Sequence, residues 1–143
     1  MKHTYLFSEG TWVATGKYFD ESNNFTKVEG KTFITHREDF WILDGYMKLL
    51  LDNPIQFENR YEIIPFNKDF TNWQSFNPAL GELVGKFMLI EDTILSTYAA
   101  KNHDYSGSEC LIKIRDDFYI SKGFALKGNT KLSSWSVELT KVE

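Results

Sequence analysis

Short segments in which apolar and polar side chains alternate follow one another along most of the chain. The clearest is residues 26–35, where charged residues alternate with Val28, Gly30, Thr32 and Ile34. Successive side chains of a β-strand point to opposite faces of a sheet, so a period of two predicts strands with one buried and one exposed face. The pattern therefore predicts an all-β chain.

Turn-forming residues separate the alternating segments. Asn, Asp, Gly and Pro favour turns, and they cluster between the segments, for example in Asp52-Asn53-Pro54 and in Lys127-Gly128-Asn129-Thr130. The resulting boundaries predict ten strands, at Thr11–Phe19, Thr26–Thr35, Phe40–Leu50, Ile55–Ile64, Thr71–Phe76, Glu82–Ile90, Thr93–Ala100, Ser108–Ile114, Phe118–Leu126 and Leu132–Lys141.

The connections between these strands are too short to hold crossover helices. The one helical alternative is residues 77–83, where Pro78 would lie in the first turn, but Gly81 and Gly85 favour a turn that leads into a strand. A long antiparallel up-and-down meander removes its two edges by closing on itself. We therefore expect residues 1–143 to form a single domain, a closed barrel of about 8–10 strands.

Composition narrows the classes of function. The net charge is −4, from 16 basic and 20 acidic residues, and this balance argues against a nucleic-acid partner and a polybasic membrane anchor. The single cysteine, Cys110, excludes an internal disulfide and a multi-cysteine metal site. No apolar run is long enough for a signal peptide or a membrane span, so a cytoplasmic location is expected. No cofactor or metal motif occurs, and we expect neither group.

Aromatic residues make up 16% of the chain and supply much of the predicted interior. If charged side chains face solvent, the alternation directs large rings and several small polar residues inwards, and mid-strand glycines leave room among them. In residues 108–114 the same rule directs Ser108, Cys110 and Ile112 inwards. A cavity lined by apolar surface with a few polar groups is typical of a small-molecule site. The residues predicted to line it are Trp41, Asn59, Tyr61, Trp73, Phe87, Tyr98, Tyr119 and Trp135.

The first predicted strand carries a family resemblance. Gly10-Thr11-Trp12 resembles the G-x-W motif of lipocalins and the wider calycin group, and Leu95-Ser96-Thr97-Tyr98 is similar to their second motif without its Asp. The Arg expected near the end of the last strand is absent, since Arg115 is the final Arg. The chain looks most like the small bacterial lipocalin-like domains of uncharacterised function. The resemblance implies a calycin-like barrel, with Trp12 packed across its closed end, that binds small, mostly apolar ligands.

A few polar residues are candidates for chemistry. His3 is predicted in a mobile terminus, and His36 and His103 in charged turns, with no close spacing that would indicate a metal site. The alternation places Arg60 on the solvent face, although a register shifted by one residue would point it inwards as a partner for an anionic ligand. We take His36, Arg60 and Glu109 as the candidate polar anchors of a ligand.

Three functions stay open at this stage. The preferred one is binding of a small apolar or aromatic molecule in the barrel, without catalysis. The second is an enzyme on the same barrel, isomerase or chromophore-lyase-like, with His36, Arg60 or Glu109 in the pocket. The third is a solid barrel that uses its outer surface to contact a partner or to form a homodimer, through the outward apolar residues Val13, Phe19, Phe33 and Met88.

Overall fold

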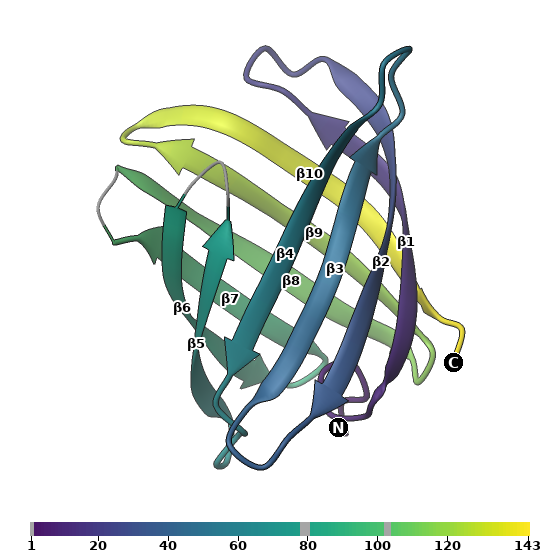
Figure 1. Ribbon diagram of the computed structural model, residues 1–143, viewed down its shortest axis with the longest axis vertical. Coiled ribbons are helices and arrows are strands. Elements are labelled where there is room, and N and C mark those ends of the chain that lie inside the picture. Colours follow the sequence, from purple (N-terminus) through teal and green to yellow (C-terminus); the bar gives the residue numbers. More distant parts are fainter. Residues whose placement is uncertain (1, 78–80, 102–103) are drawn as a thin grey trace.

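Ten antiparallel strands form the structure, a computed structural model that describes residues 2–77, 81–101 and 104–143 (Figure 1). The described residues contain no helix, and the prediction of an all-β barrel of about ten strands is confirmed. The largest boundary difference is in the eighth strand, which begins at Tyr105 rather than Ser108. The strands are β1 (Gly10–Phe19), β2 (Phe25–His36), β3 (Trp41–Leu49), β4 (Ile55–Ile63), β5 (Phe70–Asn77), β6 (Gly81–Ile90), β7 (Thr93–Ala100), β8 (Tyr105–Arg115), β9 (Phe118–Lys127) and β10 (Thr130–Lys141).

Each strand pairs with its neighbours in the sequence, and the first and last strands pair with each other. The ladder between β1 and β10 runs from Trp12 opposite Lys141 to Phe19 opposite Ser134, and it closes the barrel. Closure pairs the outer edges of the first and last strands with each other, so neither terminal strand is a free edge. The meander predicted from short loops is therefore the observed topology.

The two ends of the barrel are built differently. The N-terminal segment, residues 2–9, lies at the end that holds both chain termini, together with the turns at 37–40, 64–69, 91–92 and 116–117; we call it the closed end (Figure 1). Tyr5 and Leu6 of this segment are only 6% and 0% exposed. The ring of Tyr5 meets Trp12 edge-on at 5.1 Å, so the segment plugs this end of the barrel.

His3 belongs to this plug, and the prediction that it lies in a mobile terminus is wrong. Its side chain is 5% exposed. Nε2 donates to the carbonyl of Glu91 at 2.9 Å, which leaves Nδ1 to accept from the hydroxyl of Tyr119 at 2.7 Å. These contacts reach residues far along the chain, so no local sequence pattern could have indicated them.

The opposite end, which we call the open end, carries the turns at 20–24, 50–54 and 128–129. The wall is least continuous near this end, between β4 and β5. Those strands pair only where Arg60–Ile63 face Trp73–Phe76, so the half of β4 nearer the open end has no strand ladder with β5. Figure 1 shows the two strands separating there.

The part of the chain that the structure describes contains no helix long and apolar enough to cross a membrane.

Candidate functional site in the open half of the barrel

The interior of the barrel is filled to different degrees along its length. Towards the closed end, the inward-facing side chains of Trp12, Ile94 and Tyr119 are each 0% exposed. Towards the open end, several inward-facing rings keep part of their accessible surface although strands surround them. We call this region the open half and define it by Tyr18, Phe57, Tyr61, Tyr98, Glu109 and Trp135.

Accessible surface on inward-facing side chains means that they do not completely fill the space between them. Tyr18 lies 6.5 Å from Phe57, measured between ring centroids, while Tyr61 lies 4.6 Å from Trp73 and Trp73 lies 6.0 Å from Tyr98. These rings come from four strands, β1, β4, β5 and β7, and present flat apolar surface to one another. The arrangement suits a flat guest molecule, because aromatic rings pack well in tilted or offset contacts at these separations.

Glu109 of β8 brings a carboxylate into this aromatic region. Its Oε2 accepts two hydrogen bonds of 2.9 Å, one from the hydroxyl of Ser121 and one from the indole Nε1 of Trp135. Both donors belong to inward-facing residues of the neighbouring strands β9 and β10. A buried carboxylate is costly unless its oxygens are hydrogen-bonded, and these two donors partly offset that cost.

The surroundings of Glu109 change its acidity. Burial among aromatic and apolar groups raises the pKa of its carboxyl, and the hydrogen bonds from Ser121 and Trp135 act in the opposite direction without cancelling the rise. Because both of its hydrogen-bond donors face inwards, the accessible surface that Glu109 retains faces the barrel interior rather than bulk water. Burial, followed by the charge of Glu109, also raises the pKa of Tyr61 and Tyr98, so both phenols stay neutral.

Glycines opposite two of the rings let them lie flat against the wall. A Cβ at Gly123 would collide with the indole of Trp135, and one at Gly107 would collide with the phenol of Tyr98. Each glycine faces its ring directly across a strand pair. These two glycines therefore give the rings that line the open half room against the wall.

Buried polar atoms without partners occur on β5. The indole Nε1 of Trp73 and the hydroxyl of Ser75 are fully enclosed and have no hydrogen-bond partner among the described residues. Since the two residues are separated by one position, they point to the same, inward face of the strand. A buried polar group left unpaired costs about 1–3 kcal/mol. A bound molecule or water that reached this part of the wall would relieve that cost.

The structure places the predicted lining residues in two groups. Trp135 hydrogen-bonds to Glu109, Tyr61 and Tyr98 interact with its charge, Trp73 lies next to Tyr61, and Asn59 is half-buried on β4 two residues before Tyr61. Phe87 is buried deeper, 5.8 Å from Trp73. The other two predicted lining residues, Trp41 and Tyr119, contact the plug: Trp41 lies 5.3 Å from Phe7, and Tyr119 lies 5.7 Å from Tyr5.

The predicted facing of β8 is wrong by one residue. Ser108, Cys110 and Ile112 were expected inside, but Gly107, Glu109 and Leu111 point inwards, as the hydrogen bonds of Glu109 and the burial of Leu111 show. The rule that charged residues face solvent fails here because two interior donors, Ser121 and Trp135, form hydrogen bonds with the carboxylate. In the sequence, Gly107 is the residue that would have indicated the correct facing, because it lies opposite the inward ring of Tyr98.

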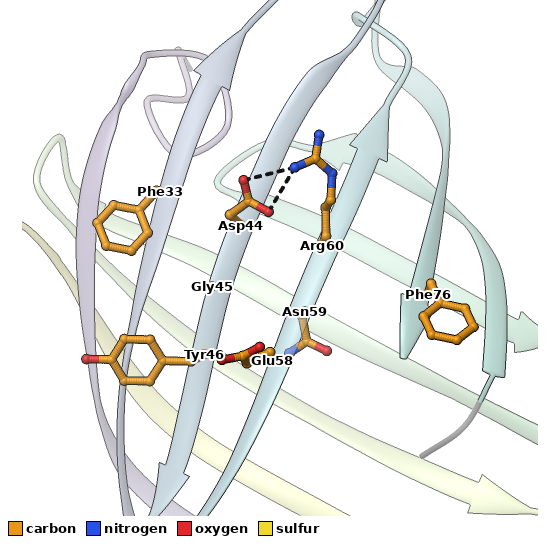
Figure 2. A pocket seen from close by; sticks show the side chains of 8 residues that line it. All are labelled: Phe33, Asp44, Gly45, Tyr46, Glu58, Asn59, Arg60 and Phe76. Atoms are coloured by element: carbon orange, nitrogen blue, oxygen red, sulfur yellow. Dashed lines mark hydrogen bonds and ion pairs between the residues drawn. The ribbon is translucent and has the colours of Figure 1, made fainter. Parts of the chain in front are cut away.

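Arg60 lies on the outer wall, as the alternation predicts, and Figure 2 shows it beside Asp44. Its Nη1 is 3.4 Å from the carboxylate of Asp44, and both side chains are about half exposed. They line a shallow groove of about 380 Å³ on the outer face of β2–β5, between Phe33 and Tyr46 on one side and Phe76 on the other (Figure 2). In this register Arg60 points away from the barrel interior.

His36 lies at the end of β2, near the closed end. Its ring stacks on Trp41 at 4.2 Å, and Nε2 donates to the carbonyl of Leu6 at 2.7 Å. It therefore holds the plug in place rather than facing Glu109. His103 lies outside the described residues. Among the residues that the structure describes, no cluster of His, Cys, Asp and Glu side chains could hold a metal ion.

Comparison with known proteins supports the architecture. No family model matches the chain, and no curated protein sequence matches it. Among solved structures, the S-type phycobiliprotein lyase CPES from Guillardia theta is similar with a TM-score of 0.70 and 11% identity, over 95% of this chain and 89% of that one. Rv2717c from M. tuberculosis is similar with a TM-score of 0.73 and 10% identity, over 94% of this chain and 92% of that one. At these identities the likeness concerns the fold: the chain is a closed, ten-stranded antiparallel barrel of the calycin-like type.

Proposed function

We propose that the protein binds a small, flat, largely apolar molecule in the open half of the barrel. The observation that carries this proposal is the difference in filling between the two halves. At the closed end Trp12 and Tyr119 are fully buried, whereas Tyr18, Tyr61, Tyr98 and Trp135 keep accessible surface inside the wall. Sites for small molecules are concave and mostly apolar, with a few polar groups that orient the ligand.

The polar groups of the open half fit the same function. Glu109 offers a hydrogen-bond acceptor among aromatic rings, with the free Oε1 open to the barrel interior. A filled barrel that served only as an interaction module would gain nothing from an interior carboxylate, since a well-packed apolar residue would cost less. Ligand binding therefore explains the interior better than the solid-barrel alternative.

An enzyme in the same site is the second candidate. Glu109 has a raised pKa, and a carboxyl group tuned towards neutrality is suited to donate or accept a proton. The similar structure that is named a phycobiliprotein lyase shares the fold and is compatible with this alternative. Conversion of a bound molecule, observed as a change in its mass during incubation with the protein, would favour the enzyme over the binding protein.

Native mass spectrometry of the protein as purified from cells is the direct test. A bound ligand gives a mass excess that disappears in a denatured control. We expect Tyr61→Ala to reduce the bound fraction, because Tyr61 lines the open half, and the matched control Tyr46→Ala to leave it unchanged, because Tyr46 lies on the outer groove.

A titration that uses the quenching of tryptophan fluorescence extends the test to ligands lost in purification. A flat aromatic dye should quench the tryptophans of the wild type, and Tyr61→Ala should weaken this binding while Tyr46→Ala does not. Two results together would contradict the proposal: an unliganded mass, and no saturable quenching by any flat aromatic compound tried.

A further inference from the structure

Glu109 differs from the other carboxylates in the described part of the chain. Those lie in turns, in the terminal segments or on the outer face of the barrel, whereas Glu109 points into the interior at the middle of β8. A carboxylate placed there costs free energy in the folded protein, because burial opposes its charge. A buried carboxylate needs hydrogen-bond donors or a positive charge nearby, and those that the protein does not supply indicate what the ligand would bring.

The two oxygens of the carboxylate have different surroundings. Oε2 accepts the hydrogen bonds from Ser121 and Trp135, both of which are neutral donors. Oε1 receives no hydrogen bond from the described residues and is not among the fully enclosed unpaired atoms. No described Lys, Arg or His forms an ion pair with Glu109. One oxygen is therefore anchored to the wall, and the other is available to a molecule in the open half.

The groups that face Glu109 from the surrounding elements are neutral. Tyr5 of the plug, Tyr61 of β4 and Tyr98 of β7 all have their pKa raised, first by burial and then by the charge of Glu109. On β9 and β10 the neighbours are Ser121 and Trp135. The residues that the structure describes thus supply no positive charge to balance the carboxylate.

The lining of the open half favours a cation over a neutral donor. The faces of Tyr and Trp rings attract positive charge, and the attraction is stronger when the cation is removed from water. A cation that reached Oε1 would gain both this contact and an ion pair in a region where water screens little. A neutral N–H group would gain one hydrogen bond and leave the buried charge unbalanced.

We propose that the ligand of the open half carries a cationic nitrogen, either a protonated amine or an alkylated ring nitrogen of a planar heteroaromatic, that pairs with Oε1 of Glu109. This inference rests on the proposed function and adds the chemical class of the ligand. The flat part of the molecule lies among Tyr18, Tyr61, Tyr98 and Trp135, and the charge fixes its orientation. An anionic molecule of the same shape is excluded by repulsion from the carboxylate.

The test uses two dyes of nearly the same shape. Thioflavin T is a planar benzothiazolium cation, and its neutral benzothiazole analogue lacks the ring N-methyl group. Dissociation constants are measured for both dyes by quenching of tryptophan fluorescence. We expect the wild type to bind the cation at least about tenfold more tightly, which corresponds to about 1.4 kcal/mol.

Two variants assign the preference to Glu109. Glu109→Gln keeps the shape and an acceptor for Ser121 and Trp135 but removes the charge, so it should lose most of the preference for the cationic dye and keep only the part due to the aromatic rings. Glu138→Gln removes an exposed carboxylate from the outer face of β10 and should retain the preference for the cation. Circular dichroism in the aromatic region confirms that each variant is folded before it is compared.

The pH dependence gives a second readout. Without a ligand, the Glu109 carboxyl holds its proton more strongly than a free carboxyl group, because burial raises its pKa. A bound cation favours the ionised form. Affinity for thioflavin T should therefore rise with pH through the titration of Glu109 and then level off, with release of a proton that calorimetry in two buffers detects. The neutral dye should show neither effect, nor should either dye with Glu109→Gln.

The outcomes separate the two proposals. If both dyes bind the wild type equally, or if Glu109→Gln keeps the full preference for the cation, the inference about charge is wrong and the binding function stands. If neither dye binds any variant and the purified protein carries no ligand, the proposed function fails as well.

Discussion

The closed end and the open half of this barrel are made from the same kinds of residue and differ in how completely those residues are packed. At the closed end, Trp12 is 0% exposed between the rings of Tyr5, at 5.1 Å, and Tyr119, at 5.6 Å. In the open half, Trp135 is also an inward indole, but it keeps accessible surface, and its Nε1 donates a hydrogen bond to Glu109. The difference comes from the plug, since residues 2–9 fill one end and nothing in the described chain fills the other.

If the proposed function holds, this contrast separates the residues that stabilise the barrel from those that bind the ligand. Packed aromatic contacts at the closed end supply the hydrophobic free energy that holds the barrel together. The open half gives up part of that free energy by leaving rings partly accessible and by placing a carboxylate among them. Sites commonly carry such local costs, which the rest of the fold compensates.

The largest expected effect comes from breaking the closed end. Trp12→Ala should lower the free energy of unfolding by about 3–5 kcal/mol, because it removes a fully buried ring and leaves a cavity. Trp135→Ala should cost clearly less, since its ring is not fully buried, while it weakens ligand binding. Urea denaturation followed by circular dichroism measures both. Equal losses in the two variants would mean that the halves are packed alike.

The plug should weaken on acidification. Burial lowers the pKa of His3 from its ordinary 6.5, so between that value and its pKa in the folded protein the unfolded chain binds more protons. Stability is thus present above about pH 6.5 and is lost as the pH falls through this window. His3→Gln should be less stable at neutral pH by about 1–3 kcal/mol and should lack this loss. Thermal unfolding at a series of pH values measures this loss of stability. If His3→Gln loses stability on acidification as the wild type does, His3 is not its cause.

The open half should respond to pH in the opposite sense. Burial raises the pKa of Glu109 above its ordinary 4.5, so the folded protein holds a proton that the unfolded chain has lost. Stability should fall as the pH rises from 4.5 through the pKa in the folded protein, by at most about 1.4 kcal/mol per pH unit, and then level off. Glu109→Gln removes this fall. If the wild-type curve, recorded without ligand, does not show this fall in stability, then burial does not destabilise the ionised form of Glu109.

The smallest effect is expected on the outer wall. Arg60→Ala breaks an ion pair of 3.4 Å between half-exposed side chains, and such pairs contribute about 1 kcal/mol at most. The variant should therefore unfold within about 0.5 kcal/mol of the wild type and bind the cationic dye equally well. A large loss of dye binding would instead place the ligand in the groove shown in Figure 2.

The sequence predicted the wall of the barrel well and its interior site only in part. The predicted segment at residues 26–35 became β2, because its alternation is clean and each residue's face follows from its neighbours. Tyr61, Tyr98 and Trp135 were directed inwards on the same grounds, and Glu109 was named as an anchor. The facing of β8 was nevertheless assigned wrongly, because both of its faces are mixed and alternation does not distinguish them.

By itself the sequence determined the number of strands, their antiparallel order and the exposure of most charged residues, since these depend on local periodicity and on turn residues. The packing of the whole fold sets which half of the barrel is filled, buries His3 against Tyr119 and turns Glu109 towards the aromatic interior. Those features arise from contacts between residues far apart in the chain. Local pattern carries no information about them, because a side chain's burial depends on what the rest of the fold places against it.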